Sequence, residues 1–153
     1  MRVSKQVTFD HDSNLWETYW EDNWGTQYTS WSHDRDGHIL HSRNDQPAEI
    51  IFNPYCEDSN YQAWYYNGLK HRDNDKPAFI GMYGAKEWYQ HGNLMRECGK
   101  PTTIESNGTQ RWQVGCAESA ILHRTDGPAV VRLDGTEEYW VAGVKVDSLD
   151  LIK

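Results

Sequence analysis

Large aliphatic side chains are scarce in this chain. Leucine, isoleucine, valine and phenylalanine together make up only 26 of its 153 residues, and the net charge is −8. Both features are typical of disordered chains. Eight tryptophans and nine tyrosines indicate the opposite, because each large ring buries much surface when it packs. The composition therefore predicts a thin folded structure with flat rings packed on a sheet, and it excludes a thick aliphatic core.

Cysteine and long apolar runs are also in short supply. The three cysteines, Cys56, Cys98 and Cys116, are far apart and odd in number, which argues against a disulfide framework and indicates a reducing compartment. The first ten residues lack the apolar segment of a signal peptide. No stretch approaches the roughly 20 apolar residues that a membrane span needs. We therefore expect a cytoplasmic protein that makes no contact with a membrane.

Positive charge is scarce in the first part of the chain. Residues 1–60 hold 4 basic and 11 acidic residues, a net charge of −7, whereas residues 61–153 hold 11 and 12, a net charge of −1. Direct binding of nucleic acid by the first part is disfavoured, because phosphates require cations. The first part is therefore predicted to be an acidic module attached to a nearly neutral remainder.

What the chain has instead is a repeat. Four tryptophans are separated by 24, 24 and 28 residues, and each is followed by a glycine. The tryptophans are Trp64, Trp88, Trp112 and Trp140, and the glycines are Gly68, Gly92, Gly115 and Gly143. A second set of positions is marked by Pro47, Pro77, Pro101 and Pro128. A fixed period of this size indicates a repeat architecture.

The clearest repeat, from Trp64 to Gly92, consists of short strands and tight turns. Asn67-Gly68 is a strong hairpin signal, since both residues tolerate positive φ. Pro77 sets φ at the entry to the next strand. Because consecutive tight turns produce an antiparallel meander, we predict an all-β protein. Its expected form is an elongated antiparallel meander sheet of repeated β-hairpins.

A single β-repeat domain over residues 1–153 is predicted. It comprises an acidic, aromatic N-terminal cap at 1–30, about four repeats over 31–146, and a tail at 147–153. Within the cap, residues 12–25 fit a short helix, because three tryptophans recur there at every fourth position. They also fit a hairpin, because tryptophan and tyrosine favour strands. The β character of the other segments favours the strand.

The repeat itself resembles one found in other proteins. The segments HRDNDKPAFI…GAKEWYQHG and LHRTDGPAVVRLDGTEEYWVAG are similar to a tandem hairpin repeat, W-x3-G-x2-HR-x-DGPA, of uncharacterised bacteriophage and giant-virus proteins. The layout is also similar to that of MORN hairpin repeats, although their Y-x-G-x-x-x-x-G-x-G core is absent. The resemblance covers residues 31–146. It implies a phage or viral origin and a binding or interference role in the host cytoplasm.

The repeated His-Arg-Asp set allows two interpretations. In the first, arginine and aspartate tie each loop to its neighbour and the histidine packs on a tryptophan, as expected when every repeat must satisfy the same interface. In the second, the cations form a row that binds nucleotide anions. The candidate ligand-binding residues are His71, Arg72, Arg96, His123 and Arg124. The third copy departs from the pattern, with Met95, Gly99 and Thr102 in place of His, Asp and Ala.

No signature of catalysis or of metal binding is present in the sequence. Gly-x-Ser-x-Gly, the P-loop and the Rossmann glycine fingerprint are all absent. The segment Asp34-Arg35-Asp36-Gly37 matches only a fragment of a calcium loop. We therefore expect no enzymatic activity, no cofactor and no metal site.

The acidic N-terminal part provides the sharper functional hypothesis. Tryptophans flanked by acids suit a hot spot for basic side chains. The candidate partner-binding residues are Trp16, Glu17, Trp20, Glu21, Asp22, Trp24, Asp34 and Asp36. We expect a non-enzymatic protein that binds and inhibits a basic host protein of defence or nucleic-acid processing. The alternatives are a binder that sequesters a nucleotide signal and a structural virion protein. Open sheet edges also allow a homodimer.

Overall fold

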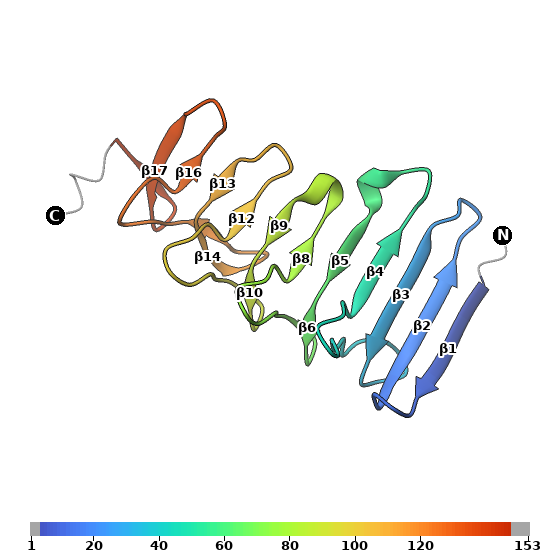
Figure 1. The fold of residues 1–153 in the computed structure, drawn as a ribbon. Helices are drawn as coiled ribbons and strands as arrows, with labels where there is room; N and C mark the ends of the chain where they lie inside the picture. The colour runs from blue at the N-terminus through green and yellow to red at the C-terminus, as the bar shows by residue number, and fades with distance from the viewer. Residues whose placement is uncertain (1–3, 148–153) are drawn as a thin grey trace.

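The computed structural model describes residues 4–147, and their regular secondary structure is almost entirely β (Figure 1). Hairpins follow one another from the N-terminal end to the C-terminal end as an elongated, twisted array. The described helical segments are two short 3-10 turns, η1 (Glu57–Ser59) and η2 (Met82–Gly84). Within the described part of the chain, no helix has the length and hydropathy that crossing a membrane requires.

Twelve strands form one continuous antiparallel sheet, and their order in the sheet follows their order in the chain. They are β1 (Ser4–Asp10), β2 (Leu15–Glu21), β3 (Gln27–Ser32), β4 (Glu49–Phe52), β5 (Tyr61–Ala63), β8 (Phe79–Ile80), β9 (Lys86–Glu87), β12 (Thr103–Ile104), β13 (Gln110–Arg111), β16 (Val130–Val131), β17 (Glu137–Val141) and β18 (Val144–Val146). The predicted class, an all-β meander sheet of repeated hairpins, is confirmed.

The remaining strands form a second row of small hairpins beside the main sheet. These strands are β6 (Tyr65–Tyr66), β7 (Leu69–Lys70), β10 (Tyr89–Gln90), β11 (Asn93–Leu94), β14 (Gln113–Cys116) and β15 (Ile121–Leu122). They make a two-stranded sheet, β6-β7, and a four-stranded sheet, β10-β11-β14-β15. In Figure 1 they lie along the lower border of the array. The sequence pattern had indicated a single sheet, so this second row is an addition to the prediction.

The periodic tryptophans mark where the chain passes from the main sheet to the small hairpins. The N–H group of Trp64 donates to the carbonyl of Ala78, at 2.8 Å, in the main sheet. The carbonyl of Trp64 accepts from the N–H group of His71, at 3.0 Å, in the small hairpin. Trp88 and Trp112 make the corresponding pairs of bonds. Each of these tryptophans is therefore a corner between two sheets.

Two kinds of turn recur among the hairpins. The small hairpin between β6 and β7 closes on Asn67 and Gly68, with φ of +49° and +80°. These angles are those of a type I′ turn, which matches the twist of antiparallel strands, so the predicted turn is confirmed. In the main sheet, the turns at 22–26, 81–85, 105–109 and 132–136 all share one pattern of backbone hydrogen bonds.

Residues 12–25 contain no helix, so the helical alternative is wrong. A turn at 11–14 is followed by β2, which pairs with β1 along its whole length and with β3 from Trp16 to Glu21. Aromatic residues favour strands, and β2 pairs with two long neighbouring strands. These two effects outweigh the preference for a helix that the four-residue spacing of the tryptophans indicates. The three strands β1, β2 and β3 form the N-terminal module discussed below.

The buried core is thin, as the composition predicted. Small side chains fill the strand entries of the repeats, where Ala48, Ala78 and Ala129 are completely buried, and Ala63, at the end of β5, is completely buried as well. Trp64, Tyr89 and Leu94 pack around Ala78 in a single cluster. Of the predicted tail at 147–153, only Asp147 lies within the described residues.

Candidate functional site

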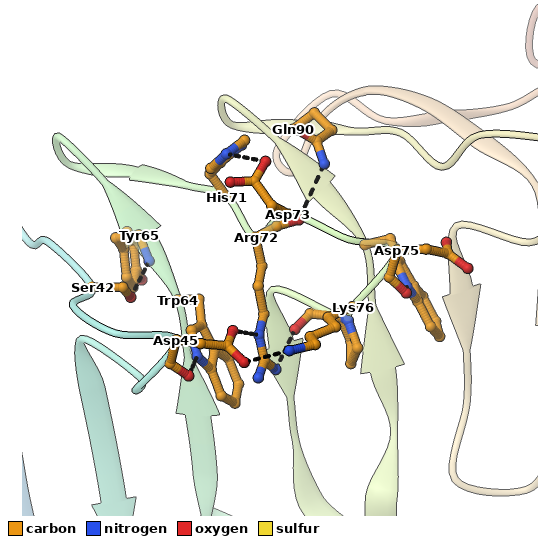
Figure 2. Close-up of polar contacts among 12 residues, drawn as sticks. Ser42, Asp45, Trp64, Tyr65, His71, Arg72, Asp73, Asp75, Lys76 and Gln90 are labelled. Carbon is orange, nitrogen blue, oxygen red and sulfur yellow. Dashed lines mark hydrogen bonds and ion pairs between the residues drawn. The ribbon is translucent and has the colours of Figure 1, made fainter.

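The repeated arginine lies over the ring of the repeated tryptophan, and Figure 2 shows one such pair, Arg72 and Trp64. The guanidinium carbon of Arg72 is 3.7 Å from the ring centre of Trp64. Nε of Arg72 donates to Oδ1 of Asp45 at 2.7 Å, and Nη1 donates to the carbonyl of Pro77 at 3.1 Å. Lys76 donates to the other oxygen of Asp45 at 2.5 Å. Because Asp45 belongs to the preceding loop, this cluster ties two repeats together.

The next repeat contains the same cluster. Arg96 lies 3.7 Å above the ring of Trp88, and its Nε donates to Oδ1 of Asp75 at 2.6 Å. Lys100 donates to Oδ2 of Asp75 at 2.7 Å. The hydrogen bond from Arg96, followed by that from Lys100, holds the pKa of Asp75 well below its ordinary value. The carboxylate is therefore ionised across the physiological range and is fully engaged by cations of its neighbouring repeat.

In the third cluster, an aspartate from a different position takes the place of the one that is missing from the repeat pattern. Gly99 takes the position of Asp45 and Asp75 in the earlier loops. Its carbonyl accepts a hydrogen bond from the indole N–H group of Trp112, at 2.7 Å. The guanidinium of Arg124 lies 4.1 Å above that ring. Its carboxylate partner is Asp126, at 2.8 Å, from its own loop. The arrangement of tryptophan, arginine and carboxylate is thus preserved although the sequence pattern is broken.

These clusters support the structural interpretation of the His-Arg-Asp set. Cavities of about 300 Å³ lie beside Arg72 and Arg96. Carboxylates line both of them: Asp45 and Asp73 in the first, Asp73, Asp75 and Glu97 in the second. An entering anion would meet these negative charges, and it would have to displace a carboxylate from each arginine. The nucleotide-binding alternative stays a prediction that this arrangement disfavours.

The repeat histidine His71 packs on a turn histidine of the next small hairpin, which differs from the expected packing on tryptophan. The ring centres of His71 and His91 are 4.3 Å apart. Nδ1 of His71 faces the N–H group of His91 at 3.4 Å, and its Nε2 lies 3.2 Å from Oδ1 of Asp73. In the last repeat, Nδ1 of His123 accepts the N–H group of Ala142 at 3.0 Å. His71 therefore contacts the turn of the β10–β11 hairpin, and His123 contacts the turn between β17 and β18.

The predicted partner-binding residues do not form one surface. Side chains alternate along a strand, so Trp16 and Trp20 of β2 project from one face of the sheet. Glu17 and Glu21 project from the opposite face, where the hydroxyl of Tyr19 donates to Glu21 at 2.9 Å. The helical spacing would have brought all four together, and the strand separates them.

In the β2–β3 turn, the carboxylate of Asp22 is engaged in hydrogen bonds, whereas the side chain of Trp24 is exposed. One oxygen of Asp22 accepts the N–H groups of Trp24 and Thr26, at 2.8 and 2.9 Å. Burial opposes ionisation of Asp22, but these bonds outweigh it and its pKa is lowered. The side chain of Trp24 is 71% exposed. Tyr55, from the NPYCEDSN insertion, lies beside this turn and is 86% exposed.

An open groove of about 610 Å³ lies on the tryptophan face of the N-terminal module. Its wall consists of the rings of Trp20 and Tyr28, which stack with centres 5.5 Å apart and planes inclined by 21°. Its floor consists of Thr18 and Ser30, which are 7% and 2% exposed. The complete lining is Lys5, Thr18, Trp20, Tyr28, Ser30, Asp36 and Gly37.

The loop after β3 brings Asp36 to this groove. Its neighbour Asp34 holds the loop, because its carboxylate accepts the N–H group of Ile39 at 2.6 Å. This bond is the main cause of the lowered pKa of Asp34. Arg35 lies over the ring of Trp16, 5.7 Å from its centre. The predicted residues Trp20 and Asp36 thus meet in one groove, whereas Asp34 has a structural role beside it.

The sequence pattern did not identify Tyr28, Thr18, Ser30 or Lys5 as site residues. Their common signal is the alternation in KQVTF, WETYW and YTSWS, which places every second side chain on the same face. Recognising the groove also requires the register of the strands, in which Trp20 lies opposite Lys5 and Tyr28.

No protein-family model, no curated protein and no solved structure matches this chain. Across residues 4–147, no group of three or more His, Cys, Asp or Glu side chains is arranged to hold a metal ion. The resemblance to phage and giant-virus repeats stays a prediction. The functional argument therefore depends on the geometry of the groove and of the repeat clusters.

Proposed function

We propose that the protein is a non-enzymatic interaction protein of phage or viral type. Its N-terminal module binds a host protein with a basic surface and inhibits it, the partner being a factor of defence or of nucleic-acid processing. The observation that carries the proposal is the groove of Trp20, Tyr28 and Asp36, which lies in the acidic part of the chain.

The chemistry of the groove suits a protein contact. Tryptophan and tyrosine contribute most often to binding hot spots, because they bury large rigid surfaces and carry polar groups at their edges. The net charge of −7 over residues 1–60 attracts a basic partner and accelerates the encounter. The repeat array, with its internally paired arginines, serves as the rigid support for this module.

Affinity purification from host lysate, with mass spectrometry, tests the proposal when wild type is compared with groove variants. We expect Trp20→Ala and Asp36→Asn to lose a partner that wild type retains. Glu17→Gln is the matched control for Asp36→Asn, because it removes the same charge from the opposite face of β2. Trp24→Ala is the control for Trp20→Ala in the same module. A partner that depends on Trp24 and not on Trp20 would contradict binding through the groove.

The predicted homodimer is a separate question. Within the described residues, β1 and β18 each pair with a single strand, so each has a free edge of the kind that pairs between chains. Molar mass measured by light scattering tests this prediction directly, since a monomer at all concentrations contradicts it.

A further inference from the structure

We infer that the groove of the N-terminal module receives an arginine side chain of the partner. This inference rests on the proposed function and specifies the chemistry of the contact. It proceeds from a comparison within the chain, between the three repeat clusters and the groove.

The chain binds its own arginines in one recurrent way. In each cluster a guanidinium lies on a tryptophan ring, at 3.7, 3.7 and 4.1 Å from the ring centre, and bonds to an aspartate. The planar guanidinium suits this environment because it can stack on a ring and donate to a carboxylate at the same time. A tryptophan with a nearby aspartate is therefore the form of arginine site that this fold uses repeatedly.

The groove contains the tryptophan and the aspartate of such a site without the arginine. Trp20, extended by the stacked ring of Tyr28, provides the aromatic wall, and Asp36 provides the carboxylate. Among residues 4–147, no cation forms an ion pair with Asp36, in contrast to Asp45 and Asp75. A volume of about 610 Å³ leaves ample room for a guanidinium and part of its aliphatic stem.

Lys5 makes the sign of the ligand charge testable. It lies opposite Trp20 in the β1–β2 pair and also lines the groove. Its ammonium repels a cationic ligand and attracts an anionic one, whereas Asp36 does the reverse. Neutralising each residue in turn therefore changes affinity in opposite directions, and the direction reveals which charge the groove accepts.

The experiment uses the full chain and the peptide acetyl-Gly-Arg-Gly-amide, with the citrulline peptide as its uncharged isostere. Binding is followed by NMR through the indole N–H resonance of Trp20, assigned with Trp20→Phe. We expect a saturable shift with the arginine peptide and about 10-fold weaker binding of the citrulline peptide, as for the loss of a charged hydrogen bond. Asp36→Asn should weaken arginine binding by a similar factor.

The remaining variants give the opposite sign and the control. Lys5→Gln should strengthen arginine binding about 2- to 5-fold, the effect of one neighbouring exposed charge. Glu17→Gln, on the far face of β2, should leave it within about 2-fold, because only screened long-range attraction is lost. Equal binding of both peptides, the absence of a saturable Trp20 shift, or reversed effects at Lys5 and Asp36 would each overturn the inference.

These outcomes are separable from those of the proposed function. If wild type retains a Trp20-dependent partner but does not distinguish arginine from citrulline, the proposed function stands and the arginine inference fails. If the peptide binds as expected but no Trp20-dependent partner is recovered, the arginine site stands and the proposed function fails.

Discussion

The repeat array and the N-terminal module use similar side chains in different ways. In the array, Arg72 and Arg96 lie on buried tryptophans and bond to carboxylates of the preceding loop. In the N-terminal module, Trp20 and Asp36 line an open groove. The difference shows that, within the repeats, the polar and aromatic groups are engaged in contacts between neighbouring repeats. In the N-terminal module, which lies outside the repeats, Trp20 and Asp36 are not engaged in this way.

The largest expected effect distinguishes the two kinds of tryptophan. Trp88→Ala should lower the free energy of unfolding by about 3 to 5 kcal/mol, because it empties a site that is only 6% exposed. Trp20→Ala should cost about 1 kcal/mol, mainly the lost stacking on Tyr28. Urea denaturation followed by circular dichroism measures both. Equal losses for the two variants would show that Trp20 is a core residue and would remove the basis of the comparison.

A smaller effect distinguishes the two kinds of aspartate. Asp75→Asn should cost about 1 to 2 kcal/mol, a value reduced for its partial exposure, because it removes the partner of Arg96 and Lys100. Asp36→Asn should change stability by less than about 0.5 kcal/mol, as for an unpaired surface position. If Asp36→Asn were as damaging as Asp75→Asn, the carboxylate would be structural and unavailable to a partner.

The pH dependence of the Asp75 effect has a defined sign. Because Arg96 depresses the pKa of Asp75 in the folded protein, the contribution of this carboxylate is complete above its unfolded pKa of about 3.9. It is lost as pH falls towards the folded value. The stability gap between wild type and Asp75→Asn should therefore close in acid, and a gap that persists there would contradict the ion-pair explanation.

The sequence predicted the features that depend on neighbouring residues. Asn67-Gly68 forms the expected turn because both residues accept positive φ. Pro77 and Ala78 lead into β8 because proline fixes φ and alanine fits a crowded position with no exposure. Such features require only local stereochemistry, so the hairpin repeat and the all-β class could be derived without knowledge of the fold.

The clusters and the groove depend on contacts between distant segments, so the sequence alone could not place them. The partner of Arg72 is Asp45, from the preceding repeat, and not the aspartate of its own motif. Tyr28 joins Trp20 only through the register of β2 and β3. The spacing of the tryptophans was compatible with a helix, and only strand pairing separates Trp20 from Glu17 and Glu21.

Another experiment examines the repeat in which the pattern is broken. Asp126→Asn should destabilise the protein, because Arg124 loses its carboxylate partner. Adding Gly99→Asp should restore part of the loss, since Asp75 occupies the equivalent position with φ of +54°, close to the +64° of Gly99. In the wild-type background, Gly99→Asp should give no gain, because a Cβ there would lie 3.6 Å from the Asp126 carboxylate. The sign of this coupling in a double-mutant cycle is the measurement. Independent effects of the two changes would contradict the proposed substitution of one aspartate by the other.

The smallest expected effect lies where the module meets the array, at His41. Burial, followed by the neighbouring charge of His33, lowers the pKa of His41. Nδ1 of His41 faces the N–H group of Asn67 at 3.3 Å, and Tyr66 packs beside the ring. The neutral imidazole is thus favoured in the folded protein, so its contribution is complete above the unfolded pKa of about 6.5 and declines as pH falls below it. His41→Gln keeps an acceptor without titrating, and it should reduce the loss of urea resistance between about pH 7.5 and about pH 5.5. If wild type and variant lose the same urea resistance over this range, His41 is not a titrating contact. The junction would then resemble the array, whose carboxylates are protonated only at lower pH.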